Sequence, residues 1–184
     1  VRTAPWRLIR GELDRVEVEA RRALLGEIIA DRLSIRLRDV HIDISRLMRE
    51  GVLAGTRVGE GEGMVVLGHE DVARFLVTAR GVGRAVVTLA GGVVTIEGDV
   101  RVGTVDLRAR LEGRLVVSSP TTVDLHVQTL TVSGVEIPEE IGRVLVSGLN
   151  PLITLRGIPL PVRIESVAAD EGQVRIHVRV GDRT

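Results

Sequence analysis

The chain has 184 residues, of which 44% are hydrophobic but only 1% aromatic, so its core must be built from Val, Leu, Ile and Ala. This composition favours β-sheet, and a chain of this length can bury a substantial core without metal ions or disulfides. Lys+Arg and Asp+Glu balance at 25 each, which predicts no global electrostatic attraction to nucleic acid. The absence of Cys excludes disulfides, thiolate zinc sites and a cysteine nucleophile.

No Ser-, Pro- or charge-rich linker divides the sequence. We therefore interpret residues 1–184 as a single domain. Residues 4–10 are largely apolar and could be the remnant of a short helix. The sequence begins with Val1 rather than Met, so we expect that an N-terminal targeting or anchoring segment could have been removed.

Strict alternation of apolar and polar residues is the commonest pattern in the chain. It is clearest at residues 16–20 and 33–37, and it recurs at residues 105–111, 123–127 and 174–180. A period of two residues is typical of antiparallel strands with one buried and one solvated face. The pattern predicts about eight strands, several of them long.

The alternation changes phase at two places. After Asp39 the apolar series continues from Val40 one residue out of step, and a second slip falls near Thr129. A β-bulge or a sharp bend at each place would return the apolar residues to one face. Gly91 and Gly92 lie between two Val-rich runs and predict a hairpin turn.

The first change to a helical period begins at His69. An apolar stripe with a spacing of three and four residues ends at Gly81, and two acids occupy the expected first turn. This pattern predicts an amphipathic helix. The stripe consists of Val72, Phe75, Leu76 and Ala79.

A second helix is expected to begin at Pro138 and to end at Asn150-Pro151, because proline suits a first helical turn and the residue before proline disfavours helix. Its apolar stripe consists of Ile141, Val144, Leu145 and Leu149. We therefore predict an α+β fold in which a long, bent antiparallel β-sheet wraps two or three short amphipathic helices.

Asp39, His41 and Asp43 are the strongest candidate metal ligands. They alternate along one expected strand, so their side chains would point the same way and could chelate a divalent metal. The same spacing recurs at Asp124, His126 and Gln128. Alternation alone, however, places the polar residues of any half-exposed strand on one face, and we interpret both sets as solvated.

Two further polar patterns have simpler structural explanations. His69, Glu70 and Asp71 place a base beside two acids, but capping and helix-dipole preferences explain them at a helix start. Gly59, Gly61 and Gly63 alternate with Glu and precede a Val-rich run, so they predict an irregular strand or loop instead of a phosphate-binding loop. We predict no catalytic residues, no metal, no cofactor and no enzymatic activity.

The apolar helix stripes remain as functional candidates. They could simply form the core of a sheet covered by helices, or they could line a lipid-binding groove, since such pockets are mostly apolar. If a groove exists, the predicted ligand-binding residues are Val72, Phe75, Leu76, Ile141, Leu145 and Leu149.

The order of several short motifs resembles the LmeA-type phospholipid-binding proteins of actinobacteria and related bacteria. The motifs are LIRGELDRVEV at residues 8–18, LSIRLRDVHID at 33–43, EDV at 70–72, the block from IP at 137 to LNPL at 149–152, and IPLPVRI at 158–164. The resemblance implies a fold similar to the tubular lipid-binding proteins, in which a curved antiparallel sheet wraps a long helix. It also implies an exported or membrane-anchored protein of the cell envelope.

The leading hypothesis is therefore non-enzymatic binding of phospholipid, or of another fatty acyl ligand, in a groove between the sheet and the helices. Such a protein would assist cell-envelope lipid metabolism or lipid transfer, and it could contact a membrane peripherally without binding nucleic acid. The alternative is a structural or interaction domain with a filled core and no ligand. A third hypothesis is a metal-dependent hydrolase that uses Asp39, His41 and Asp43.

Overall fold

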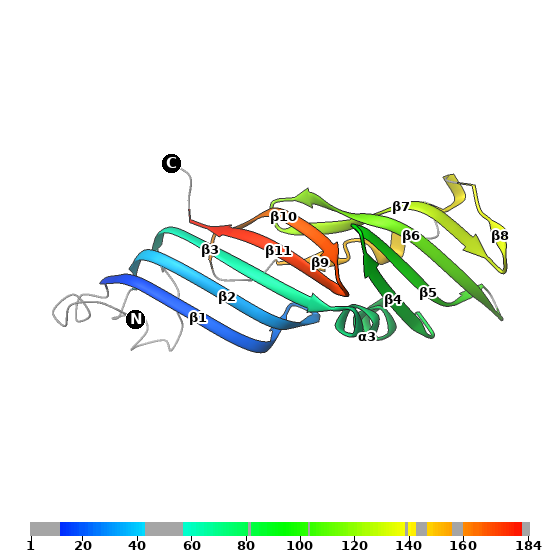
Figure 1. The fold of residues 1–184 in the computed structure, drawn as a ribbon, viewed down its shortest axis with the longest axis horizontal. Helices are drawn as coiled ribbons and strands as arrows, with labels where there is room; N and C mark the ends of the chain where they lie inside the picture. Colours follow the sequence, from blue (N-terminus) through cyan, green and yellow to red (C-terminus); the bar gives the residue numbers. More distant parts are fainter. Residues whose placement is uncertain are drawn as a thin grey trace.

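The computed structural model describes residues 12–42, 57–80, 82–102, 104–138, 140–142, 147–155 and 160–181. These residues form two antiparallel sheets that follow one another along the long axis of the molecule (Figure 1). The five-stranded sheet has the order β1 (Glu12–Leu25), β2 (Ile28–His41), β3 (Arg57–Gly68), β11 (Gln173–Val180) and β10 (Val162–Asp170).

The second sheet has six strands. Five of them are in sequence order, and β9 (Ile153–Thr154) pairs with β7. The sequential strands are β4 (Ala85–Ala90), β5 (Val93–Val102), β6 (Val105–Ser119), β7 (Thr122–Val132) and β8 (Val135–Glu136). The expected long antiparallel strands are thus confirmed, although they are divided between two sheets.

The described residues contain one helix of more than three residues, α3 (His69–Arg80). It confirms the helix expected after His69. Of the second expected helix, residues 140–142 are helical and η1 (Ser147–Leu149) is a 3-10 turn, while residues 143–146 lie outside the described ranges, as do residues 4–10. The prediction of one sheet wrapped around two or three helices is therefore corrected. The described residues are mostly β-sheet and contain little helix.

The five-stranded sheet bends where two strand residues adopt left-handed backbone angles, Arg22 with φ 54° and Asp39 with φ 51°. The β1–β2 register is unchanged across Asp39. Leu37 and Val40 are both buried although they are three residues apart, which regular alternation would not allow. The phase slip expected at Asp39 is therefore confirmed as a local backbone bend that returns the apolar residues to one face.

The second expected slip is a β-bulge. The β6–β7 register shifts between Glu112 and Gly113, so that Gln128 of β7 has no directly opposed residue. A Cβ atom at Gly113 would collide with the backbone carbonyl oxygen of His126, which explains the glycine at this position. The expected Gly91-Gly92 turn is also confirmed: both residues have positive φ, 58° and 79°, as a two-residue hairpin turn requires.

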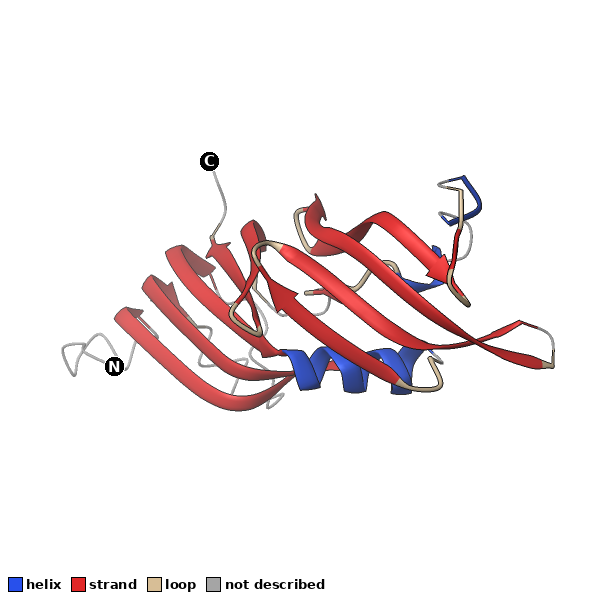
Figure 2. Cartoon of the chain, turned by 45° about the vertical axis from the view of Figure 1, so that its right-hand side comes forward, coloured by secondary structure: helices blue, strands red, loops and turns tan. Residues whose placement is uncertain are grey.

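A continuous hydrophobic core joins the two sheets to α3. The buried residues Val72, Phe75 and Leu76 of α3 pack into a cluster that includes residues of both sheets. Figure 2 shows α3 at the junction of the sheets. The β4–β5 and β10–β11 turns also meet there, because Gly92 N donates to Ala169 O and Gly172 N donates to Leu89 O, both at 2.9 Å.

Candidate functional site

One face of the five-stranded sheet carries a strip of apolar side chains that is only partly covered. Cross-strand pairing places Val18 opposite Ile35 and Ala20 opposite Leu33, so these side chains share one face of β1 and β2. Val18 is 41% exposed, and the neighbouring side chains are half-buried. We call Val16, Val18, Ala20, Leu33 and Ile35 the apolar strip.

Two hydrophobic clusters lie at opposite ends of the apolar strip. Leu33 packs against the main core, which contains α3. Val16 and Ile35 pack against a second cluster formed by Leu37, Val40, Val58 and Val180. Val162 packs against both clusters. The apolar strip is therefore more exposed than the two hydrophobic clusters at its ends. Together they form one continuous apolar surface.

The glycines of β3 adapt this apolar face for close packing. A Cβ atom at Gly61 would lie 2.6 Å from Leu37 Cδ2, and one at Gly63 would lie 2.8 Å from Val178 Cγ2. Both distances are too short for real contacts, so the neighbouring side chains occupy the space that larger residues would need. The sequence pattern at Gly59, Gly61 and Gly63 thus belongs to a strand, as one of the two expected alternatives stated.

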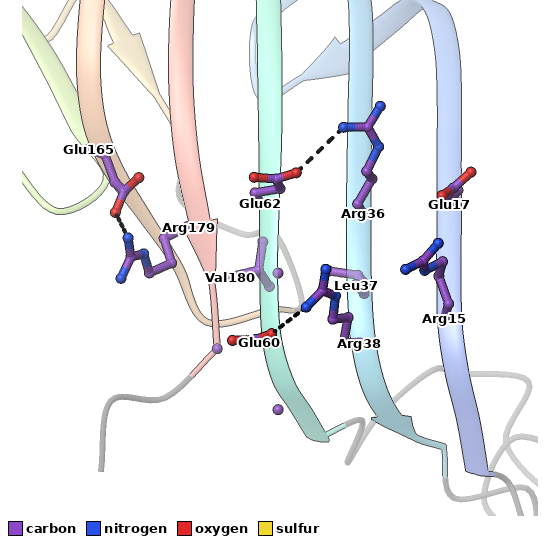
Figure 3. Close-up of a pocket in the computed structure, with 13 residues that line it drawn as sticks. Arg15, Glu17, Arg36, Leu37, Arg38, Glu60, Glu62, Glu165, Arg179 and Val180 are labelled. Atoms are coloured by element: carbon purple, nitrogen blue, oxygen red, sulfur yellow. Dashed lines mark hydrogen bonds and ion pairs between the residues drawn. The ribbon is translucent and has the colours of Figure 1, made fainter.

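The opposite face of the same sheet is charged. It contains an open hollow of about 900 Å³ (Figure 3). Arg36 pairs with Glu62 at 3.4 Å and Arg38 pairs with Glu60 at 3.2 Å, and these side chains are more than 60% exposed. Exposed pairs of this kind contribute little to stability. The hollow is lined by equal numbers of Arg and Glu side chains: Arg15, Arg36, Arg38, Arg179, Glu17, Glu60, Glu62 and Glu165.

The predicted ligand-binding residues separate into several environments. Val72, Phe75 and Leu76 are at most 5% exposed and belong to the main core, and Leu149 packs against that core while half-buried. Ile141 is 55% exposed, and Leu145 lies outside the described residues. The stripe of α3 therefore has the core role that the sequence left open, and its contact with a ligand stays a prediction.

The candidate metal sets lose the geometry on which they depended. Asp39 adopts a left-handed backbone conformation, which a regular strand residue does not have, and Asp43 lies outside the described ranges. The β-bulge likewise removes Gln128 from regular alternation with Asp124 and His126. Among the residues that the structure describes, no three His, Cys, Asp or Glu side chains are grouped to hold a metal ion.

The two acids of the expected helix start lie at the start of α3, and one of them has a side-chain partner. Glu70 and Asp71 lie in the first turn of α3, where the helix dipole favours negative charge. Asp71 also accepts a hydrogen bond from Arg74 at 3.0 Å. The helix-dipole interpretation of this segment is therefore supported by the position of the two acids in α3.

Sequence reasoning recognised β1 and β2 as strands but did not single out the apolar strip. The sequence does contain the pattern that marks the strip, because residues 16, 18 and 20 and residues 33, 35 and 37 are all apolar. Which of them remain accessible depends on how far the core extends over the sheet. That extent is a property of packing between distant segments.

An accessible apolar stretch on a sheet face is a surface on which a ligand, a membrane or another protein can bind. The comparison with known families gives the class of protein. The chain belongs to the LmeA-like phospholipid-binding family, whose model matches residues 1–179, and this confirms the family resemblance. No curated protein and no solved structure matches the chain. No helix in the described ranges is long and apolar enough to cross a membrane.

Proposed function

We propose that this protein binds phospholipid without catalysing a reaction, and that acyl chains lie on the apolar strip. The observation that carries the proposal is the accessible apolar face, with Val18 41% exposed at its centre. The family match supports phospholipid as the ligand. Covering apolar groups on both partners is favourable by about 0.8 kcal/mol for each buried CH₂ group.

The strip suits acyl chains better than the charged hollow does. The described side chains of the strip carry no charge, so an acyl chain lying there would not desolvate an ion. An acyl chain in the hollow would cover Arg and Glu side chains that are now hydrated. The expected groove between sheet and helices is accordingly proposed at the strip, bounded at one end by the core that contains α3.

The cellular role follows from the same proposal. An exported or membrane-anchored protein that holds phospholipid on a sheet face would assist cell-envelope lipid metabolism or transfer lipid. It would contact the membrane peripherally while exchanging its ligand. The family description supports the ligand class, and the envelope location is part of the proposal.

The test is lipid content and uptake with a matched pair of variants. Purified protein should release phospholipid on solvent extraction and should take up labelled phospholipid from vesicles. Val18→Asp should reduce uptake at least tenfold, on the order of the cost of placing a charge against an acyl chain. Val116→Asp is the control, because Val116 is also 41% exposed but lies on β6 of the other sheet.

Both variants should retain the wild-type circular dichroism spectrum, since each side chain is partly solvated. Wild-type protein that is folded, releases no lipid and takes none up would contradict the proposal. It would favour the alternative of a structural domain with a filled core. The nearly complete burial of Val72 and Leu76, at 1% and 0% exposure, is the observation that supports this alternative.

A further inference from the structure

The hairpin formed by β1 and β2 ends in an exposed apolar tip. Leu24 is 70% exposed, more than any other large hydrophobic side chain of the described residues. It lies directly opposite the half-buried Ile29, so the two side chains share one face of the hairpin. We call Leu24 and Ile29 the apolar tip. It lies beside α3 (Figure 1), whereas residues 1–11 and 43–56 join these strands about 40 Å away, at their opposite ends.

Two arginines lie behind the apolar tip on the same face. Arg21 and Arg32 are exposed and directly opposite one another. The left-handed backbone of Arg22, with φ 54°, interrupts the alternation of β1 between them and the tip. In β2, Ala30 is buried in the main core and Leu33 packs against it, although the two residues are three positions apart. The outward-facing residues on the two sides of this bend are therefore also three positions apart, so the arginines share the outer face with the apolar tip.

The arginines of the hairpin have no carboxylate partner. Arg21, Arg22 and Arg32 make no ion pair or hydrogen bond with a side chain within the part of the chain that the structure describes. Like charges directly opposite one another on two strands are destabilising. The Arg21–Arg32 pair therefore does not stabilise the hairpin, and an anion bound between the two guanidinium groups would remove their repulsion.

The positive charge is concentrated at this end of the hairpin. Residues 21–32 contain three arginines and two acids. Arg80 of α3 adds another guanidinium group, because its Nη1 lies 3.9 Å from Oε2 of Glu27 in the turn. Four arginines thus lie beside two carboxylates, whereas the whole chain has no net charge. A local charge of this sign attracts anionic lipid headgroups.

We propose that the β1–β2 hairpin docks on the surface of a bilayer that contains anionic phospholipid. The apolar tip enters the boundary between headgroups and acyl chains, and Arg21, Arg22 and Arg32 bind lipid phosphates. Binding of this kind grows with the apolar area that is buried and with the attraction to anionic lipids. The proposal rests on the proposed function, because the membrane is then the source of the phospholipid ligand.

The spacing between the apolar tip and the arginines fits the depth of such a contact. Arg21 and Arg32 lie three positions behind the tip, which is about 10 Å along a strand. Apolar surfaces in the membrane interface are buried to a depth of about 5–10 Å. Arginine side chains also extend along apolar surface while their charged ends stay in the polar region. The guanidinium groups therefore reach the lipid phosphates when the tip is inserted.

The test is cosedimentation of the full chain with vesicles of phosphatidylglycerol and phosphatidylcholine in equal amounts, compared with phosphatidylcholine alone. The wild type should bind the mixed vesicles more tightly, and high salt should weaken this binding by screening the charges. Leu24→Asp should weaken it on the order of tenfold, because a carboxylate replaces the inserting side chain. Val135→Asp is the matched control, since Val135 is 65% exposed on β8 of the other sheet.

Arg21→Glu should give two results that a merely destabilising substitution would not give together. It should weaken binding to the mixed vesicles on the order of tenfold, because a positive charge near the anionic surface becomes negative. It should also leave the free energy of unfolding unchanged or raise it, because an attractive pair with Arg32 replaces a repulsive one. Arg114→Glu controls for the change in net charge, since Arg114 is exposed on β6 and has no ion pair in the described ranges.

Wild-type protein that does not bind the mixed vesicles would overturn the proposal, and so would binding that is indifferent to Leu24→Asp. Self-association without vesicles that Leu24→Asp abolishes would also overturn it, because the apolar tip would then contact a second copy of the chain. Uptake of phospholipid delivered by cyclodextrin tests the proposed function separately, because it requires no membrane. Leu24→Asp should leave that uptake unchanged, since Leu24 is not part of the apolar strip, so docking and lipid uptake can fail independently.

Discussion

At the scale of single residues, Asn150 connects two parts of the chain that are far apart in sequence. Its side-chain oxygen accepts a hydrogen bond from Leu125 N at 2.9 Å, and its Nδ2 donates to Leu125 O at 3.1 Å. Leu125 is buried in β7, so neither backbone group can easily turn to water. Asn150 therefore satisfies a backbone donor and acceptor that the strand pairing leaves available at this point.

Replacement of Asn150 by Ala should lower the free energy of unfolding by about 1–3 kcal/mol, because it leaves buried polar groups without partners. Urea denaturation monitored by circular dichroism measures this change. Gln173→Ala is the control, since Gln173 is also a half-buried amide, at the start of β11, with no side-chain hydrogen bond to the described residues. Equal stabilities of the two variants would contradict the role of Asn150.

At the scale of secondary-structure elements, the β-bulge in β7 controls which residues of a long strand face the core. Leu125 and Leu130 are both buried although they are five positions apart, which regular alternation would not permit. The bulge supplies the extra residue, and Gly113 on β6 allows the two backbones to approach. The bend at Asp39 has the same effect in β2 through a single left-handed residue.

Gly113→Ala should therefore lower the free energy of unfolding by about 2 kcal/mol or more, because the new methyl group meets backbone that cannot rotate away. Thermal denaturation is a suitable measurement. Gly148→Ala is the matched control, since a Cβ atom there would have no heavy atom within 4 Å. A fully tolerated Gly113→Ala would show that the bulge can relax.

At the scale of the whole molecule, α3 packs against both sheets. It contacts β2 and β3 of one sheet and β4 of the other. Phe75 is 5% exposed at this junction, and the guanidinium carbon of Arg80 lies 5.0 Å from the centre of its ring. Because the core is shared, loss of packing at α3 should weaken both sheets together.

Phe75→Ala should lower the free energy of unfolding by about 3–5 kcal/mol through the cavity that it leaves. Both sheets should unfold in a single transition. Hydrogen exchange measured in β2 and in β6 tests this expectation. Val77→Ala on the exposed side of α3 should cost less than about 1 kcal/mol, since Val77 is 40% exposed. If Phe75→Ala left stability unchanged but abolished lipid uptake, Phe75 would line a binding site and would not be a core residue.

The family and the local structure were accessible from the sequence. Alternation identified β1, β2, β6, β7 and β11, the phase slips located the bend at Asp39 and the bulge near Thr129, and the apolar spacing after His69 identified α3. These features depend on the backbone preferences and periodicity of neighbouring residues, which a sequence displays directly. The division into two sheets was not predicted, because it depends on pairing between segments as distant as β3 and β11.

The sequence by itself therefore determined that this protein is an antiparallel β-sheet protein with a short amphipathic helix and bent strands. Only the tertiary structure decided which apolar residues are core and which are accessible. Phe75 and Val18 both occupy apolar positions of regular amphipathic elements, yet one is buried and the other is 41% exposed. The physical reason is that burial depends on what packs above a residue. For Phe75 that is the junction of two sheets, whereas Val18 lies on an edge strand beyond the main core.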